Sequence, residues 1–162
     1  MLRRMPAKRG QIKYKARRQQ IVDFSGLRFG NKTSTDIDGY LDFGDKASIF
    51  TELKLEGTPV ERGQELAFER IVDDVSKSKA AIFIIADHAI YDAEQEIPAH
   101  TCLVRKYRYK YKWYSGSAQF PMVIDIVNHF LRQHGLSNEV QNMAIELDED
   151  GNPIDDSWME NL

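Results

Sequence analysis

The chain has 162 residues, 42% of them hydrophobic, and a net charge of −3 at pH 7. This length and apolar content suit one ordinary domain. A membrane-spanning protein is excluded, because no run approaches the roughly 18 consecutive apolar residues that a spanning helix needs. The N-terminus lacks the apolar segment of a signal peptide, so we expect a cytoplasmic protein without a membrane partner. The single cysteine, Cys102, excludes an internal disulfide.

The near-neutral total hides a basic N-terminal arm, residues 1–18, which contains Lys and Arg but no Asp or Glu. A Lys or Arg placed on a phosphate releases counterions, so the arm is a candidate for nucleic-acid contact, and a solvated terminus is the equal alternative. The candidate binding residues of the arm are Lys13, Lys15, Arg17 and Arg18. Lys13 to Phe24 predicts a short helix, which Ser25-Gly26 ends.

Two strand-like runs follow, Asp36 to Phe43 and Ala47 to Leu55. The linker Gly44-Asp45-Lys46 has the length and the glycine of a tight hairpin, so we expect the two strands to be antiparallel.

A helix is predicted next by three signs: Thr58 at the N-cap, Pro59 at the first helical position and Glu61 three residues after the cap. It should run to about Lys77. Its apolar face carries Val60, Ala67, Phe68, Ile71, Val72 and Val75.

The run Ala80 to Ala86 has no polar alternation, as a strand covered on both faces requires. Because a strand, a helix and a second strand form a right-handed crossover, this strand should lie parallel to the one at Ala47 to Leu55.

The remaining chain predicts strand structure over Cys102 to Tyr114 and an amphipathic helix over Phe120 to Leu131, ended by Gly135. An acidic, mobile tail is expected over residues 138–162. The fold class is therefore α/β, with residues 19–137 forming a single domain. Its mixed central sheet combines an antiparallel hairpin with a parallel crossover strand and is flanked by helices.

Asp38, Glu52 and Lys54 form the candidate chemical site. The hairpin brings Glu52 near Asp38, and two adjacent carboxylates repel each other unless a proton or a divalent cation lies between them. Mg²⁺ suits them because it prefers carboxylate oxygens. Lys54 shares the face of Glu52 and can offset negative charge on a phosphate. Asp36 competes with Asp38 for the first acidic position.

Gln64 lies on the inward face of the predicted helix, one turn from its start. A buried amide needs a hydrogen-bond partner, and the carboxylate and lysine of this site are within its reach. A structural glutamine bonded to backbone is the alternative.

Asp38, then Phe50-Thr51-Glu52-Leu53-Lys54, then Gln64 on the next helix resemble the core of the PD-(D/E)XK nuclease superfamily, the restriction-endonuclease-like fold. The resemblance implies Asp38 and Glu52 as metal-binding acids, the Leu53 carbonyl as a further ligand, Lys54 as the catalytic lysine and Gln64 as the helix glutamine of some branches. It also implies Mg²⁺, for which Mn²⁺ would substitute. Ile37 stands where the family has proline. Ile21 to Asp74 is also similar to uncharacterised bacteriophage proteins, which would place the chain in a host cytoplasm.

The run Arg105 to Tyr114 alternates basic and aromatic residues, which predicts one face carrying Lys106, Arg108, Lys110, Lys112 and Tyr114 and another carrying Arg105, Tyr107, Tyr109, Tyr111 and Trp113. The four lysine and arginine residues of the first face match a phosphate track, and an ordinary strand with a basic outer face is the alternative.

Together these features favour a metal-dependent DNA endonuclease or exonuclease, which hydrolyses phosphodiester bonds with a metal-activated water. RNA stays open as a substrate, and a homodimer would suit the cutting of two strands. The alternative function is a catalytically inactive nuclease-fold protein of a phage that binds nucleic acid or a host component.

Overall fold

The computed structural model describes residues 23–32 and 34–143. Within them, residues 35–140 form one compact unit that contains all the described strands. The other described segments include the short 3-10 helix η1 (Ser25–Leu27) and an isolated bridge between Phe29 and Lys32. The basic arm and the chain beyond Met143 lie outside the described residues. So does the helix predicted from Lys13, except for its last two positions, Asp23 and Phe24, which are not helical.

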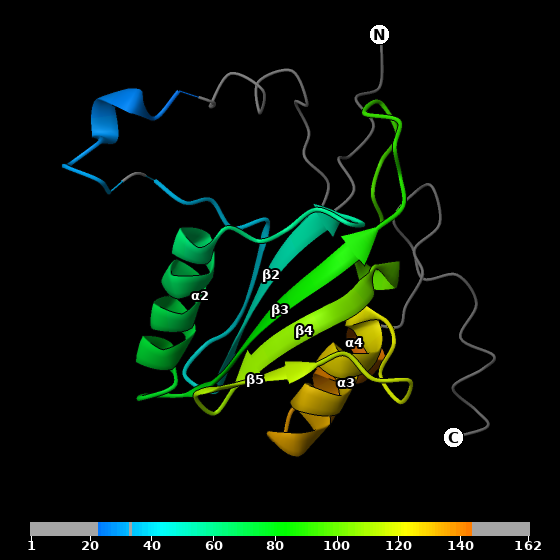
Figure 1. Cartoon of the computed structure of the whole chain (residues 1–162). Helices are drawn as coiled ribbons and strands as arrows, with labels where there is room; N and C mark the ends of the chain where they lie inside the picture. The colour runs from blue at the N-terminus through cyan, green and yellow to red at the C-terminus, as the bar shows by residue number, and fades with distance from the viewer. Residues whose placement is uncertain (1–22, 33, 144–162) are drawn as a thin grey trace, which may run out of the picture. The chain divides into compact units, whose positions relative to one another are not determined.

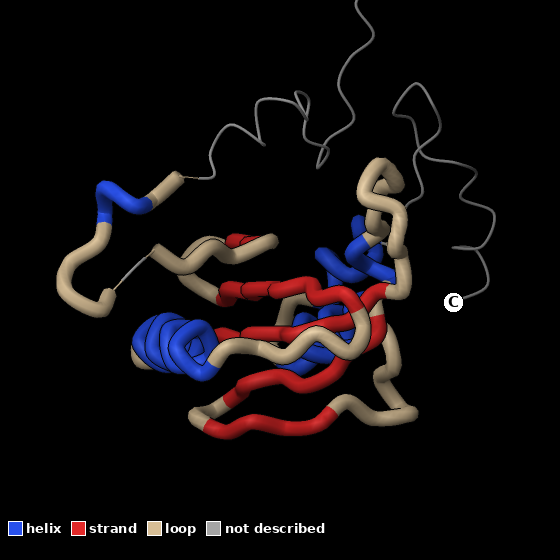
Figure 2. The backbone as a smooth tube through the Cα atoms, turned by 45° about the horizontal axis from the view of Figure 1, so that its top comes forward, coloured by secondary structure: helices blue, strands red, loops and turns tan. Residues whose placement is uncertain are grey.

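The compact unit is an α/β fold built on a five-stranded mixed sheet with the spatial order β1-β2-β3-β4-β5 (Figure 1). The strands are β1 (Gly39–Phe43), β2 (Ala47–Leu55), β3 (Ala80–His88), β4 (Leu103–Tyr109) and β5 (Lys112–Ser115). Only β2 and β3 are parallel. The predicted hairpin and parallel crossover are therefore confirmed. Figure 2 shows the strands side by side, with the loop between β3 and β4 extending past their ends.

Helix α2 (Arg62–Val75) connects β2 to β3 and is shorter than predicted at both ends. The cap predicted at Thr58 is wrong, because the Thr58 N–H donates to the Leu55 carbonyl in a turn that ends β2, and Gly57 there has a φ of 80°. The first helical bond instead runs from Glu65 N to Glu61 O, at 2.9 Å.

The core lies on both faces of the sheet. On one face, Phe68 and Val72 of α2 pack on Phe50 and Phe83, with the Phe68 and Phe83 ring centroids 4.2 Å apart. Ile71, expected on this buried face, has 37% of its surface exposed. On the other face, Tyr109 contacts Phe130 of α3 (Val123–Gln133) edge to face. Helix α3 confirms the second predicted helix, and Gly135 ends it with a φ of 72°.

The basic and aromatic run forms a hairpin and not one strand. β4 and β5 pair antiparallel, and the turn between them consists of Lys110 and Tyr111, which both have positive φ. The turn resets the alternation, so Trp113 pairs with Arg108 and Lys112 pairs with Tyr109. The prediction that four cations line one face is therefore wrong, since Lys112 lies on the opposite face from Lys106 and Arg108.

Candidate functional site

Glu52 is the most deeply buried acid of the described chain, with only 3% of its surface exposed. It lies in β2 between β1 and β3, on the face covered by α2, where Phe50 precedes it in the core. A carboxylate in this position loses its hydration and must be compensated by other polar groups. Glu52 and the groups that compensate it thus form a polar site inside an otherwise apolar layer.

Two side chains donate to the same oxygen of Glu52. The Lys54 ammonium lies 2.7 Å from Glu52 Oε1, and the Gln64 amide donates to this atom at 2.9 Å. Lys54 reaches Glu52 because the two residues share a strand face, and Gln64 reaches it from the first turn of α2. The structure therefore brings together three of the residues expected from the sequence, and the alternative of a backbone-bonded glutamine does not hold.

The second oxygen of Glu52, Oε2, is buried and has no hydrogen-bond partner among the described residues. Buried carboxylate oxygens nearly always have a partner, and an unsatisfied one is a recognised sign of a missing ion or water. This atom is the strongest chemical feature of the site.

Asp38 lies immediately before β1, and its Oδ2 accepts a hydrogen bond from the Leu53 N–H at 2.7 Å. Leu53 stands between Glu52 and Lys54, so this bond ties Asp38 to the centre of the site. Asp36 also precedes β1, and its charge acts on Glu52 together with that of Asp38. Both candidates for the first acid thus lie near Glu52, and the hydrogen bond to Leu53 favours Asp38.

The pKa of Glu52 is raised above its ordinary value, chiefly because burial disfavours the charged carboxylate. The negative charges of Asp38 and Asp36 raise this pKa further. The hydrogen bond and the charge of Lys54 act in the opposite direction. A second positive charge near Glu52 would therefore lower the cost of ionising it.

The residues present fit a hard divalent cation only in part. Within residues 23–32 and 34–143, no group of three or more His, Cys, Asp or Glu side chains is arranged to hold a metal ion. The candidate ligands are the carboxylates of Asp38 and Glu52. Of these, Glu52 Oε2 is the oxygen with no hydrogen-bond partner among the described residues. Mg²⁺ keeps several waters and is commonly bound by one or two carboxylates, so the number of acids, though not a complete ligand set, is compatible with it.

Two further ion pairs surround the site and were not anticipated from the sequence. Asp87, which pairs with Lys54 in the β2–β3 register, binds Arg105 through both carboxylate oxygens. Lys106 lies 2.6 Å from Glu65, the neighbour of Gln64. The signal available for Asp87 was its place directly after the apolar run Ala80–Ala86, where a charged residue still belongs to β3 and needs a partner.

The residues predicted to bind nucleic acid differ in whether the structure pairs them with acidic residues. Lys106 and Arg108 are both engaged with α2, the first with Glu65 and the second with Asp73 at 2.7 Å. Lys110 and Lys112 make no ion pair within the described part of the chain. Lys13, Lys15, Arg17 and Arg18 lie outside it.

Comparison of the chain with protein-family models, with curated proteins and with solved structures finds no match in any of the three. No helix of the described residues is long and apolar enough to cross a membrane.

Proposed function

We propose that the chain is a Mg²⁺-dependent nuclease with a restriction-endonuclease-like core, acting on DNA. The observation that carries this proposal is the buried Glu52 carboxylate, one oxygen of which binds Lys54 and Gln64 while the other has no partner among the described residues. A purely structural glutamate would be expected to satisfy both oxygens. A carboxylate that ligates a cation needs one oxygen left for it.

In this proposal Asp38 and Glu52 hold the ion, with the Leu53 carbonyl as the further ligand that the family resemblance suggests. Hydrogen bonds to ligating carboxylates orient them, which is the role of Gln64 on Glu52 and of the Leu53 N–H on Asp38. When bound, Mg²⁺ would supply a water of lowered pKa and charge compensation on the phosphate.

Lys54 has the catalytic role in this proposal. Hydrolysis adds the oxygen of water to phosphorus and breaks the ester bond, so negative charge builds up on the phosphoryl oxygens in the transition state. The Lys54 ammonium lies 2.7 Å from Glu52 Oε1 on a side chain that is 20% exposed, and in this proposal it offsets this charge. Such an interaction lowers the barrier because it is stronger in the transition state than in the ground state.

The decisive test is single-turnover cleavage of DNA by Lys54→Met, with Mg²⁺ or Mn²⁺ present. We expect DNA binding nearly intact and a cleavage rate lowered on the order of a hundredfold or more, since oxyanion-type stabilisers contribute at this scale. Lys46→Met is the matched control, because Lys46 is an exposed lysine in the turn between β1 and β2. Gln64→Ala should lie between wild type and Lys54→Met, since an amide positions Glu52 but carries no charge.

Equal cleavage by Lys54→Met and wild type would overturn the catalytic assignment. Metal-independent DNA binding without cleavage, by wild type, would favour instead the alternative of a nuclease-fold protein that binds nucleic acid without chemistry. Linear, branched and single-stranded DNA, together with RNA, serve as the substrate panel.

A further inference from the structure

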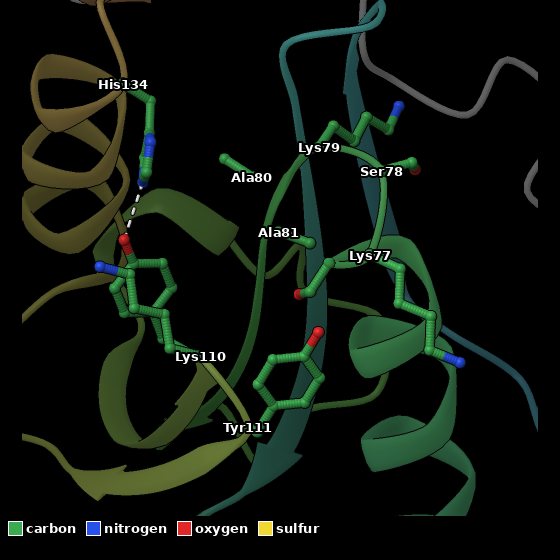
Figure 3. Close-up of a pocket in the computed structure, with 10 residues that line it drawn as sticks. Lys77, Ser78, Lys79, Ala80, Ala81, Lys110, Tyr111 and His134 are labelled. Carbon is green, nitrogen blue, oxygen red and sulfur yellow. Dashed lines mark hydrogen bonds between the residues drawn. The ribbon is translucent and has the colours of Figure 1, made fainter.

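A cavity of about 380 Å³ opens at the end of the sheet opposite the candidate site. It is bordered by the start of β3, the β4–β5 turn and the end of α3 (Figure 3). Glu52 pairs with Ile85, whereas the cavity reaches β3 at Ala80 and Ala81. At about 3.3 Å per residue, the two places are separated by roughly 13–17 Å along the strand. The cavity is therefore not part of the Glu52 site.

One wall of the cavity carries a hydrogen-bonded hydroxyl and imidazole beside a lysine. The Tyr109 hydroxyl and His134 Nε2 lie 2.9 Å apart, and the Lys110 ammonium lies over the Tyr109 ring, 5.2 Å from its centroid. Figure 3 shows His134 and Lys110 on one side of the cavity, with the Tyr111 hydroxyl directed toward Ala81 across from them. No acidic residue is among the described residues that line the cavity.

Two other lysines border the cavity but are turned away from it. Lys77 pairs with Asp74 at 2.7 Å, and Lys79 binds Asp42 and the Gly44 carbonyl. Their ammonium groups point outward in Figure 3. Lys110 is thus the lysine lining the cavity that has no ion pair within the described residues, and the small side chains of Ala80 and Ala81 line the same space.

The backbone of the turn adds a separate observation. Lys110 and Tyr111 have φ values of 48° and 66°, the left-handed conformation that two-residue hairpin turns normally assign to Asn and Gly. Side chains other than Asn, Asp and Gly are strained there, and such strain gathers at binding sites. The chain accepts this cost at two residues that both line the cavity.

We propose that this cavity is a phosphate-binding site, in which Lys110, His134 and the hydroxyls of Tyr109 and Tyr111 bind the oxygens of a phosphate group. A cation, an imidazole and hydroxyls around an acid-free space match the acceptor oxygens of a phosphate. The phosphate comes either from a free nucleotide or from the end of a nucleic-acid strand. This site rests on its own residues and not on the proposed nuclease reaction.

The experiment is a calorimetric titration of the full chain with inorganic phosphate, with a nucleoside 5′-monophosphate, and with one oligonucleotide in 5′-phosphorylated and unphosphorylated forms. Lys110→Asn removes the charge while supplying a residue that favours the left-handed turn, so the hairpin is retained. We expect it to weaken phosphate binding roughly tenfold or more, as the loss of one charge-assisted contact implies. Lys77→Asn is the matched control, because that ammonium points away, and it should leave the affinity within about twofold.

His134 supplies a second measurement, by NMR titration of its ring. Burial, with the charge of Lys110, lowers the pKa of His134, and Tyr109 and Lys110 are the titratable groups that face it. A bound phosphate should raise this pKa, since a nearby anion favours the imidazolium. The proposal is overturned if inorganic phosphate leaves the pKa of His134 unchanged, or if Lys77→Asn weakens binding as much as Lys110→Asn. Preference for the phosphorylated oligonucleotide over the mononucleotide would assign the phosphate to a strand end, and the reverse to a free nucleotide.

Discussion

Glu52 has a polar environment that a hydrophobic residue of similar volume would not need. Burying a carboxylate is costly, and its single ion pair with Lys54 together with one amide bond satisfies only one oxygen. Replacement of such groups by apolar residues is often neutral or stabilising. An incompletely satisfied acid in the core therefore costs stability, and the proposed chemical role would account for it.

The pH dependence of folding should reveal this cost. Because the pKa of Glu52 is raised in the folded chain, the unfolded chain releases this proton at lower pH than the folded chain does. The contribution of Glu52 to stability is thus fully present below its ordinary pKa of 4.5 and is lost as the pH rises through the raised value. Glu52→Gln should remove this loss, so its free energy of unfolding should exceed that of wild type at pH 7.

Urea denaturation of both proteins between pH 4 and pH 8 measures the effect. Asp45→Asn, at an exposed turn position, is the control, and it should follow wild type. If Glu52→Gln and wild type showed parallel stability curves, Glu52 would not titrate differently in the two states.

The alternating pattern of β2 would allow Lys54 to face solvent, but in the structure Lys54 is bound to Glu52. It is 20% exposed and bound to a buried carboxylate, so Lys54→Met leaves Glu52 with one partner fewer. We expect a loss of about 1–3 kcal/mol at pH 7, the usual cost of an unpaired buried group. The same measurement on Lys46→Met should give a change within about 0.5 kcal/mol, as surface substitutions do. A change that small for Lys54→Met would contradict the buried pair.

At the scale of elements, α2 is fastened to the β4–β5 hairpin by a row of polar contacts. Arg108 donates through Nε and Nη2 to the two carboxylate oxygens of Asp73, and Trp113 Nε1 donates to Glu69 at 2.9 Å. Together with the Lys106 pair, these contacts lie beside the stack of Phe68 on Phe83. The helix that carries Gln64 is therefore positioned by the same cations that the sequence suggested for phosphate binding.

Arg108→Gln should consequently act on stability. Arg108 is largely buried and bidentate, so we expect a loss of about 1–3 kcal/mol. Lys112→Gln removes a charge of the same hairpin that has no ion pair within the described residues, and it should change stability by about 0.5 kcal/mol or less. Thermal unfolding of the two variants distinguishes them, and equal melting temperatures would show that the Arg108–Asp73 fork does not fasten α2.

At the scale of the whole molecule, a bound cation should stabilise the fold. A ligand that binds only the folded state raises stability by RT ln(1 + [L]/Kd), about 2.7 kcal/mol at a hundredfold excess over Kd. We expect Mg²⁺ or Mn²⁺ to raise the melting temperature of wild type and to have a much smaller effect on Glu52→Gln, which lacks the ligating charge. An equal rise in both proteins would place the ion elsewhere.

DNA binding by the whole chain should also depend on salt through the cations that are not used internally. Each phosphate contact contributes a slope of about 0.9 for duplex DNA, or about 0.7 for single strands, in a plot of log affinity against log salt. The double variant Lys110→Gln, Lys112→Gln should flatten this slope more than Lys106→Gln, because Lys106 is engaged with Glu65. An unchanged slope for the double variant would mean that Lys110 and Lys112 are ordinary solvated surface residues that do not contact DNA phosphates.

The sequence alone predicted the elements from β1 to β3, helix α3 and the residues that meet around Glu52. Periodicity and turn residues predicted the hairpin of β1 and β2, the crossover through α2 and the buried β3, since these depend on local patterns of side chains and on the handedness of crossovers. The face shared by Glu52 and Lys54, and the inward position of Gln64, followed from the same periods. The start of α2 was misplaced because Thr58 entered the turn that ends β2.

Only the tertiary structure decided which polar groups pair and which are left over. The Lys110-Tyr111 turn carries none of the usual turn residues, so the hairpin it forms was not predictable. Because of this turn, Lys112 and Trp113 lie on the opposite faces from those predicted. Likewise, Arg108 binds Asp73, whereas Glu52 Oε2 has no partner among the described residues. Both outcomes depend on contacts between segments far apart in the chain. Burial and pairing are properties of packed elements, and a linear pattern of residues does not contain them.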